Sequence, residues 1–115
     1  MYPDDLTRLR HMRDAAKEAL DFANGKQRAD LDKDRQLALA LLKSIEIIGE
    51  ASAAISAETT SRYPEIPWRQ IRGMRNRLVH GYYEVDLNVV WDTVAHNLGP
   101  LLAVLEQIVP TGNFR

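Results

Sequence analysis

The sequence of 115 residues contains no cysteine. This excludes disulfide bonds, a thiolate nucleophile and any metal site built on cysteine ligands. The sequence also lacks any run near the ~20 consecutive apolar residues of a membrane-spanning helix. Its first ten residues mix Asp4 and Asp5 with Arg8 and Arg10 instead of leading into an apolar stretch. We therefore expect a soluble, cytoplasmic protein without membrane contact.

An overall excess of positive charge, common in nucleic-acid-binding proteins, is absent too, because the formal net charge is -1. The charge is nevertheless unevenly distributed. The segment from Ser61 to His80 has five arginines and one acid, Glu65, so it carries +4 and the rest of the chain -5. Its arginines are Arg62, Arg69, Arg72, Arg75 and Arg77. A patch of this size suits a few phosphates of one RNA segment better than a long duplex.

Apolar residues at three- and four-residue spacing predict a helix from Asp4 to Asn24, with Asn24-Gly25 as its C-terminal stop. A second helix follows the polar stretch from Lys26 to Asp34, and its broad apolar face places it at the centre of the fold. That face consists of Leu37, Leu41, Ile45, Ile48, Ser52 and Ile55, widened by Leu42 and Ile47. Gly49 costs about 1 kcal/mol of helix propensity, which favours a close approach of another helix there.

The next connection contains Pro64 and Pro67. Pro67 suits the first turn of a third helix, whose interior runs from Trp68 to about His80 and which stops near Gly81. This helix is short and rich in arginine.

Asp86 is a suitable N-cap for a fourth helix, which continues until Pro110. Its apolar positions are Leu87, Val90, Trp91, Val94, Leu98, Leu101, Leu105 and Ile108. Gly99-Pro100 should kink or break it. Because the sequence shows no alternating strand pattern and no repeat, we predict one all-α domain over residues 1–115, an up-and-down four-helix bundle with a kinked or broken last helix.

The segment from Arg75 to Tyr82 combines two arginines, an amide, an imidazole and a phenol near one predicted helix end. At about 100° per residue, Arg72, Asn76 and His80 share a helix face, whereas Arg75 lies roughly 140° from His80. Two arrangements bring Arg75 and His80 together. Either the length of the arginine side chain closes the gap, or a two-fold dimer places the segments of two subunits in one cleft.

These side chains suit RNA cleavage by transesterification, in which the 2′-hydroxyl attacks the adjacent phosphorus and neither a metal nor another cofactor is needed. His80 can accept or donate the proton, because an unperturbed imidazole has a pKa of about 6.5. Arg75 can stabilise the charge on the phosphate, and Asn76 can position the hydroxyl or the histidine. Further predicted substrate contacts come from Arg72, Arg77 and Tyr82.

The same segment also permits a purely structural explanation, because the helix dipole favours a histidine at a helix C-terminus and arginines commonly coat exposed faces. Glu46 and Glu50, one turn apart, are a weaker metal-site candidate, since no histidine supports them, and we expect them to pair with arginines. No phosphate-binding glycine loop and no serine or cysteine triad is present. We expect structural, solvated or core positions for His11, His96, Trp68 and Trp91.

At these residues the sequence resembles the HEPN superfamily, and within it the HepT-like toxins that accompany a minimal nucleotidyltransferase antitoxin. The resemblance rests on Arg75-x-x-x-x-His80-x-Tyr82 inside the string from Ile66 to Tyr82. Two further segments agree, Ser44 to Ala51 in the second predicted helix and Val90 to Leu105 in the fourth. The likeness covers nearly the whole chain and is weakest from Met1 to Arg35.

The resemblance implies a helical bundle that homodimerises, so that both motif segments line one cleft in which Arg75 and His80 carry metal-independent ribonuclease activity and Asn76 supports them. It also implies a type VII-like toxin–antitoxin pair with an MntA-like nucleotidyltransferase, which silences the toxin by transferring AMP from ATP to Tyr82. Tyr83 is the less suitable acceptor. An added adenylate brings negative charge and bulk into a cleft that receives phosphates, so it would compete with RNA. Transfer RNA is a candidate target in this family.

Two other functions fit the same residues. A non-catalytic nucleotide-binding partner of a nucleotidyltransferase predicts saturable nucleotide binding without RNA cleavage. A scaffold whose arginines make only assembly contacts predicts that charge reversal at Arg75 disrupts assembly before any activity. The ribonuclease is our main hypothesis.

Overall fold

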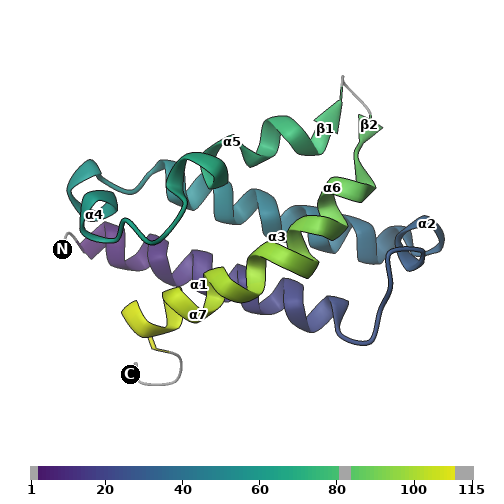
Figure 1. Cartoon of the computed structure of the whole chain (residues 1–115), viewed down its shortest axis with the longest axis horizontal. Helices are drawn as coiled ribbons and strands as arrows, with labels where there is room; N and C mark the ends of the chain where they lie inside the picture. Colours follow the sequence, from purple (N-terminus) through teal and green to yellow (C-terminus); the bar gives the residue numbers. More distant parts are fainter. Residues whose placement is uncertain (1–2, 81–83, 111–115) are drawn as a thin grey trace.

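Four long helical units form an all-α bundle, as predicted (Figure 1). The computed structural model describes residues 3–80 and 84–110, with the backbone alone for residues 3, 75–80 and 84. The four units are α1 (Pro3–Ala23), α3 (Arg35–Ala53), α5 (Trp68–Leu78) and a last unit made of α6 (Leu87–Asp92), the π-helical turn η1 (Thr93–Asn97) and α7 (Leu98–Ile108). Helix α3 is central, because it packs against α1 on one side and against α5 and α6 on the other.

The ends of α1 and α3 follow the stop and start signals of the sequence. Gly25, two residues after α1, has a φ of 76°, a left-handed conformation that glycine adopts without strain. Asp34 caps α3, because its Oδ1 accepts a hydrogen bond from the backbone N–H of Leu37 at 3.0 Å. The predicted stripe from Leu37 to Ile55 is buried, although Ile55 lies just beyond α3, and Leu42 and Ile47 at its margin are half-buried. Its one polar member, Ser52, donates its hydroxyl to the carbonyl of Gly49 at 2.8 Å.

Two short helices lie within the connections, and the apolar periodicity of the sequence did not predict them. They are α2 (Asp30–Lys33), between α1 and α3, and α4 (Ala57–Arg62), after α3. Helices of four and six residues are too short to show a repeating apolar face. Ser56 caps α4 by accepting a hydrogen bond from the backbone N–H of Thr59 at 3.3 Å. The hydroxyls of Ser56 and Thr59 both donate to Asp5 of α1, which fastens this connection to the first helix.

The last helical unit is interrupted one turn before Pro100. Proline has no backbone N–H, so the preceding turn cannot keep the regular α-helical hydrogen-bond pattern. The backbone adopts a π-helical turn over Thr93–Asn97, closed by a hydrogen bond from the N–H of Leu98 to the carbonyl of Thr93. The predicted interruption of this helix is confirmed, and its form is a π-helical turn.

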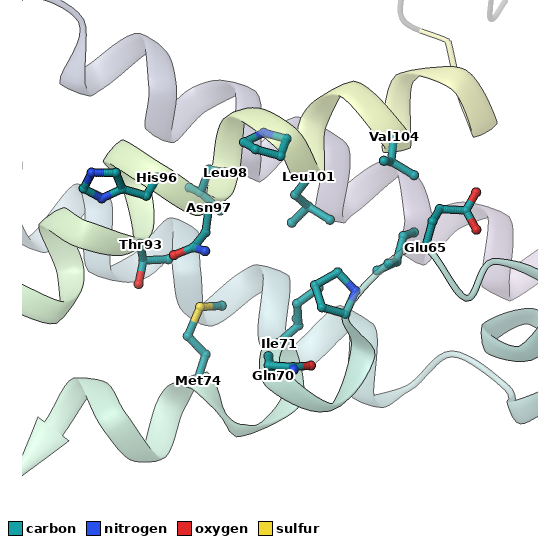
Figure 2. Close-up of a pocket in the computed structure, with 13 residues that line it drawn as sticks. Glu65, Gln70, Ile71, Met74, Thr93, His96, Asn97, Leu98, Leu101 and Val104 are labelled. Carbon is teal, nitrogen blue, oxygen red and sulfur yellow. The ribbon is translucent and has the colours of Figure 1, made fainter.

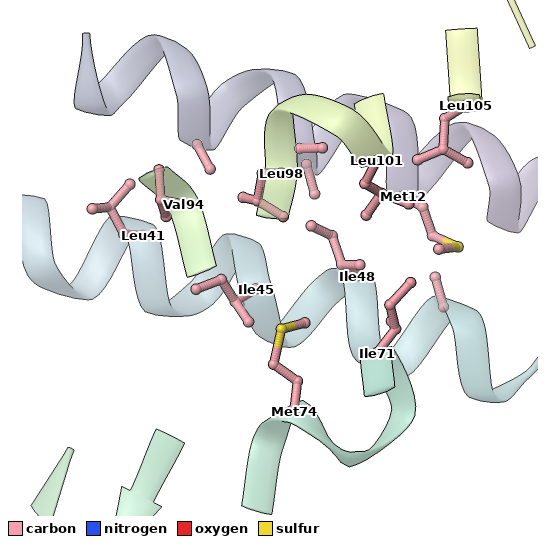
Figure 3. Close-up of a cluster of buried hydrophobic side chains, with 14 of the residues drawn as sticks. Met12, Leu41, Ile45, Ile48, Ile71, Met74, Val94, Leu98, Leu101 and Leu105 are labelled. Carbon is pink, nitrogen blue, oxygen red and sulfur yellow. The ribbon is translucent and has the colours of Figure 1, made fainter. Parts of the chain in front are cut away.

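One cluster of buried apolar side chains lies between α1, α3, α5 and the last unit (Figure 3). Trp68 belongs to it, whereas Trp91 is half-buried and packs against its edge. The labelled members of the cluster in Figure 3 are Met12, Leu41, Ile45, Ile48, Ile71, Met74, Val94, Leu98, Leu101 and Leu105. Each fully buried side chain of this size contributes about 1.5–3 kcal/mol. No helix in the described part of the chain combines the length and the apolarity that crossing a bilayer would require.

Candidate active site on helix α5

Helix α5 carries the first residues of the motif, and its first two turns are fixed to the bundle. Trp68 is buried at its start, and the indole Nε1–H donates to the carbonyl of Tyr63 at 3.0 Å. Ile71 and Met74 follow at three-residue steps and are also buried. This side of α5 therefore faces the core, and the motif begins at Arg75, directly after the last of these anchors.

The close approach that the sequence predicts at Gly49 is observed between α3 and α5. A Cβ atom added to Gly49 would lie 3.5 Å from the backbone oxygen of Ile71. That is ordinary van der Waals contact, so a methyl group fits and a larger side chain would meet the backbone of α5. The segment from Ser44 to Ala51, noted in the sequence for its resemblance, thus sets how closely the motif helix approaches the centre of the bundle.

Helix α5 ends two residues earlier than predicted. It stops at Leu78, and Val79–His80 form strand β1, which pairs antiparallel with strand β2 (Glu84–Val85). The register places Val79 opposite Val85 and His80 opposite Glu84. The two β-branched valines favour extended backbone, and cross-strand pairing offers the chain an alternative to one more helical turn.

The prediction that His80 shares a helix face with Arg72 and Asn76 is therefore wrong, because the helix does not reach His80. The backbone places Arg75 and Asn76 in the last turn of α5 and His80 on β1. The pairing of the motif residues in space stays a prediction. Outside the described residues lie the side chains of Arg75, Asn76, Arg77 and His80, together with the whole of Tyr82.

Arg72 is the predicted site residue whose side chain is described, and it contacts the end of α3. Its guanidinium donates to the carbonyl of Ser52 from Nε at 3.3 Å and from Nη2 at 3.2 Å, and it reaches the carbonyl of Ile55 at 3.5 Å. Its Cζ lies 5.9 Å from the centre of the Trp68 ring, within cation–π range. The positive charge thus faces the partial negative charge of a helix C-terminus. These contacts favour a positioning role, and substrate binding by Arg72 stays a prediction.

Polar contacts hold the start of α6 beside the strand pair. Asp86 follows β2 directly and caps α6 as predicted, because its Oδ1 accepts from the backbone N–H groups of Asn88 at 3.1 Å and Val89 at 3.2 Å. Arg28, in the connection between α1 and α3, donates from Nε to Oδ1 of Asn88 at 2.7 Å. It also forms an ion pair with Asp32 at 3.2 Å. The start of α6, which follows strand β2, is thereby tied to the connection between α1 and α3, a contact that no sequence pattern indicated.

The glutamates considered as a metal pair lie on α3, Glu46 half-buried and Glu50 exposed. Within the described residues, no three histidine, aspartate or glutamate side chains lie close enough together to hold a metal ion. Neither glutamate forms an ion pair with a described side chain, so their pairing with arginines stays a prediction. His11 and His96 are exposed, in agreement with the solvated positions expected for them.

A groove of about 380 Å³ lies between α5 and the last helical unit (Figure 2). Figure 2 shows Met74, Thr93, His96 and Asn97 at one end and Glu65 with Val104 at the other. Because Met74 directly precedes Arg75, the first of these ends borders the motif. The lining residues between the two ends are Ile66, Pro67, Gln70, Ile71, Leu98, Pro100 and Leu101. No sequence pattern indicates this groove, because lone amides and a lone histidine on helices form no motif.

Comparison with known proteins matches a family model described as ribonuclease HepT-like to residues 12–108. The probable ribonuclease HepT of Thermococcus cleftensis is 39% identical over 75 residues, which cover 65% of this chain and 68% of that protein. A protein of Caldanaerobacter subterraneus subsp. tengcongensis, whose name calls it a candidate RNase, is 30% identical over 101 residues, 88% of this chain and 90% of its own. A similarly named protein of Methanocaldococcus jannaschii is 28% identical over 93 residues, 81% of this chain and 77% of its own. No solved structure gives a significant match.

Proposed function

Since the chain belongs to the ribonuclease HepT-like family, we propose that it is a metal-independent endoribonuclease and the toxin of a toxin–antitoxin pair. The observation that carries this proposal is that the family match spans the complete motif, from Arg75 at the end of α5 to Tyr82 beyond β1. The names of the relatives as ribonucleases support the same activity. The proposed substrate is RNA in the cytoplasm, with transfer RNA as the first target to test.

The proposed reaction is an internal transesterification. The 2′-oxygen of the ribose forms a bond to the adjacent phosphorus, and the bond from phosphorus to the 5′-oxygen breaks, which leaves a 2′,3′-cyclic phosphate and a 5′-hydroxyl. His80 takes the proton of the 2′-hydroxyl or gives one to the departing 5′-oxygen, roles that an imidazole fills near neutral pH. Arg75 stabilises the charge that develops on the non-bridging oxygens, and Asn76 orients the hydroxyl or the imidazole. Arg77 and Tyr82 bind the neighbouring phosphates.

The active form that we propose is a homodimer. Arg75 lies on the last turn of α5 and His80 on β1, so the end of the helix separates them along the chain. A two-fold axis beside this helix end would bring two motif segments into one cleft, in which arginine and histidine can come from different subunits. Mixing His80→Ala and Arg75→Ala subunits tests this directly. Restored cleavage supports a shared cleft, whereas a mixture as inactive as its components places both residues in one subunit.

We further propose that a nucleotidyltransferase antitoxin silences the enzyme by adenylylating Tyr82. The phenol oxygen forms a bond to the α-phosphorus of ATP, pyrophosphate leaves, and the phenolic proton passes to a base of the transferase. The attached AMP brings a phosphate close to the arginines, where it competes with RNA. Intact mass spectrometry after co-expression with such a transferase should show one added AMP group in the wild type and in Tyr83→Phe. A modified Tyr82→Phe protein would place the acceptor elsewhere.

The ribonuclease is tested with the purified full-length chain in the presence of EDTA. The wild type should cut RNA, and His80→Ala should cut it at least about 10²-fold more slowly, the usual contribution of a general acid or base. His11→Ala is the matched control, because it removes an exposed histidine of α1 far along the chain from the motif. Wild-type rates in His80→Ala would remove the assigned acid and base. Saturable nucleotide binding without any RNA cleavage would instead identify a non-catalytic partner of the transferase.

A further inference from the structure

The groove between α5 and the last helical unit suits an uncharged, planar ligand. Its lining is mainly apolar, and no lysine or arginine is among the described residues that form it. Glu65 lies at the end away from the motif and would repel a phosphate there (Figure 2). The volume of about 380 Å³ is near the lower limit for small-molecule sites and accommodates a single ring system rather than a polymer.

Three polar residues, Thr93, His96 and Asn97, lie at the end of the groove that borders the motif (Figure 2). His96 Nδ1 lies 3.2 Å from the carbonyl oxygen of Asp92. Because a carbonyl can only accept, Nδ1 carries the proton in this contact, and Nε2 of the neutral imidazole remains an acceptor. Beside it, Asn97 precedes α7 but makes no capping hydrogen bond there, so its exposed amide offers both a donor and an acceptor. Gln70 supplies a second exposed amide from α5.

We propose that this end of the groove binds the base of a nucleotide next to the scissile phosphate, and that it prefers adenine or cytosine, whose Watson–Crick edges differ from those of guanine and uracil. The inference rests on the proposed ribonuclease function. Adenine and cytosine present an amino donor beside an unprotonated ring nitrogen, which complements the acceptor of His96 and the amide of Asn97. In other nucleic-acid complexes asparagine recognises adenine through a comparable pair of hydrogen bonds, to the amino group and to a ring nitrogen.

The groove is adjacent to the motif along α5, so a base bound in it would lie close to the proposed catalytic residues. Met74 forms part of the groove, and the next residue is Arg75. A base lying against Met74 and Ile71 therefore leaves its phosphate near the backbone of Arg75 and away from Glu65. Unstacked RNA bases bind in this manner, with the ring face on apolar side chains and the edge on hydrogen-bonding groups. The groove then selects the base, and the motif cuts beside it.

The test compares short single-stranded RNAs that differ in one base beside the cleavage site. The wild type should cut the adenine- and cytosine-containing RNAs faster than those with guanine or uracil. Asn97→Ala and His96→Ala should each reduce this preference by about tenfold at most, the equivalent of one hydrogen bond, while cleavage of the other RNAs changes little. Gln107→Ala is the matched control, because it removes an exposed amide of α7 that does not line the groove.

An unchanged base preference in both variants, with cleavage intact, overturns the base site and leaves the ribonuclease standing. If the wild type cuts no RNA, the ribonuclease proposal fails, and binding decides the base site alone. In that case adenosine 5′-monophosphate, but not uridine 5′-monophosphate, should shift the side-chain amide resonances of Asn97, and equal or absent shifts overturn the inference. Dissociation of a dimer by Asn97→Ala, seen in sedimentation, also overturns it, because a second copy of the chain would then cover the groove.

Discussion

Replacing Asp5 with alanine should destabilise the protein strongly, because this carboxylate is buried and accepts several hydrogen bonds. The side chain is 2% exposed at the start of α1. Its carboxylate accepts hydrogen bonds from the backbone N–H of Ser56 at 3.1 Å, from the Ser56 hydroxyl at 2.6 Å and from the Thr59 hydroxyl at 2.6 Å. Asp5 therefore fastens the connection between α3 and α5 to the first helix, and its loss leaves buried donors without an acceptor.

The magnitude follows from these contacts. A hydrogen bond to a charged group contributes about 1.5–3 kcal/mol, but three bonds that share one carboxylate do not add fully. We expect a loss of about 3 kcal/mol of unfolding free energy for Asp5→Ala. With an unfolding entropy of about 2.1 cal/mol/K per residue over 115 residues, this loss lowers Tm by about 12 °C.

The same carboxylate gives the effect a defined pH dependence. Burial alone raises the pKa of Asp5, but the hydrogen bonds from Ser56 and Thr59 and the charge of Arg8 together outweigh it, and the pKa is lowered from its usual value of 3.8. The folded state therefore binds the proton less readily than the unfolded state. The stabilisation is complete above about pH 4 and is lost as the pH falls through the lowered folded-state pKa.

Urea and thermal denaturation at several pH values test this prediction. The matched control is Asp4→Ala, which removes the neighbouring carboxylate from the same helix terminus but from an exposed position. The control should change stability by less than about 1 kcal/mol, the range of a charge at a helix end. Equal losses in the two variants, or a gap between wild type and Asp5→Ala that grows as the pH falls below about 4, would refute the reasoning.

Two further predictions concern the placement of α5. Arg72→Ala should lower the unfolding free energy by about 1–2 kcal/mol, because the bonds to Ser52 and the contact with Trp68 are lost; urea denaturation measures this, and an Arg69→Ala protein that loses as much would contradict it. Gly49→Ala should stay within about 1 kcal/mol of wild type, whereas Gly49→Leu should displace α5 and lower both stability and RNA cleavage. Unchanged RNA cleavage by Gly49→Leu would show that the distance between α3 and α5 does not affect the activity.

Much of the fold could be predicted from the sequence because the relevant signals are local. The apolar stripe of α3 repeats over several turns, so one helical period explains all its positions. Gly25 and Asp86 likewise form a helix stop and a helix cap with atoms of their immediate neighbours. Even the contact behind Gly49 could be inferred, because a glycine in a long helix has a cost that close packing offsets.

The features that escaped prediction depend on partners far along the chain. The end of α5 at Leu78 reflects the pairing of Val79 with Val85, and strand pairing competes with the helix only after the chain has turned back. Asp5 bonds to residues 51 and 54 positions away, and helical periodicity contains no information about such contacts. The groove requires two helices that are adjacent in space and not in sequence. For the motif itself, the sequence predicts the chemical groups, and their meeting in space stays a prediction.

The residues of α5 have different roles before and after Met74, the last described residue of this helix that is buried in the core. Up to Met74, α5 is held by the burial of Trp68, Ile71 and Met74 and by the bonds of Arg72 to the end of α3. The motif begins with the next residue, and the helix ends within one turn at Leu78. The described anchors therefore hold α5 up to Met74, and the motif follows them directly along the chain. Substitutions of these anchors should therefore act mainly through stability, and substitutions of Arg75, Asn76 and His80 mainly through cleavage.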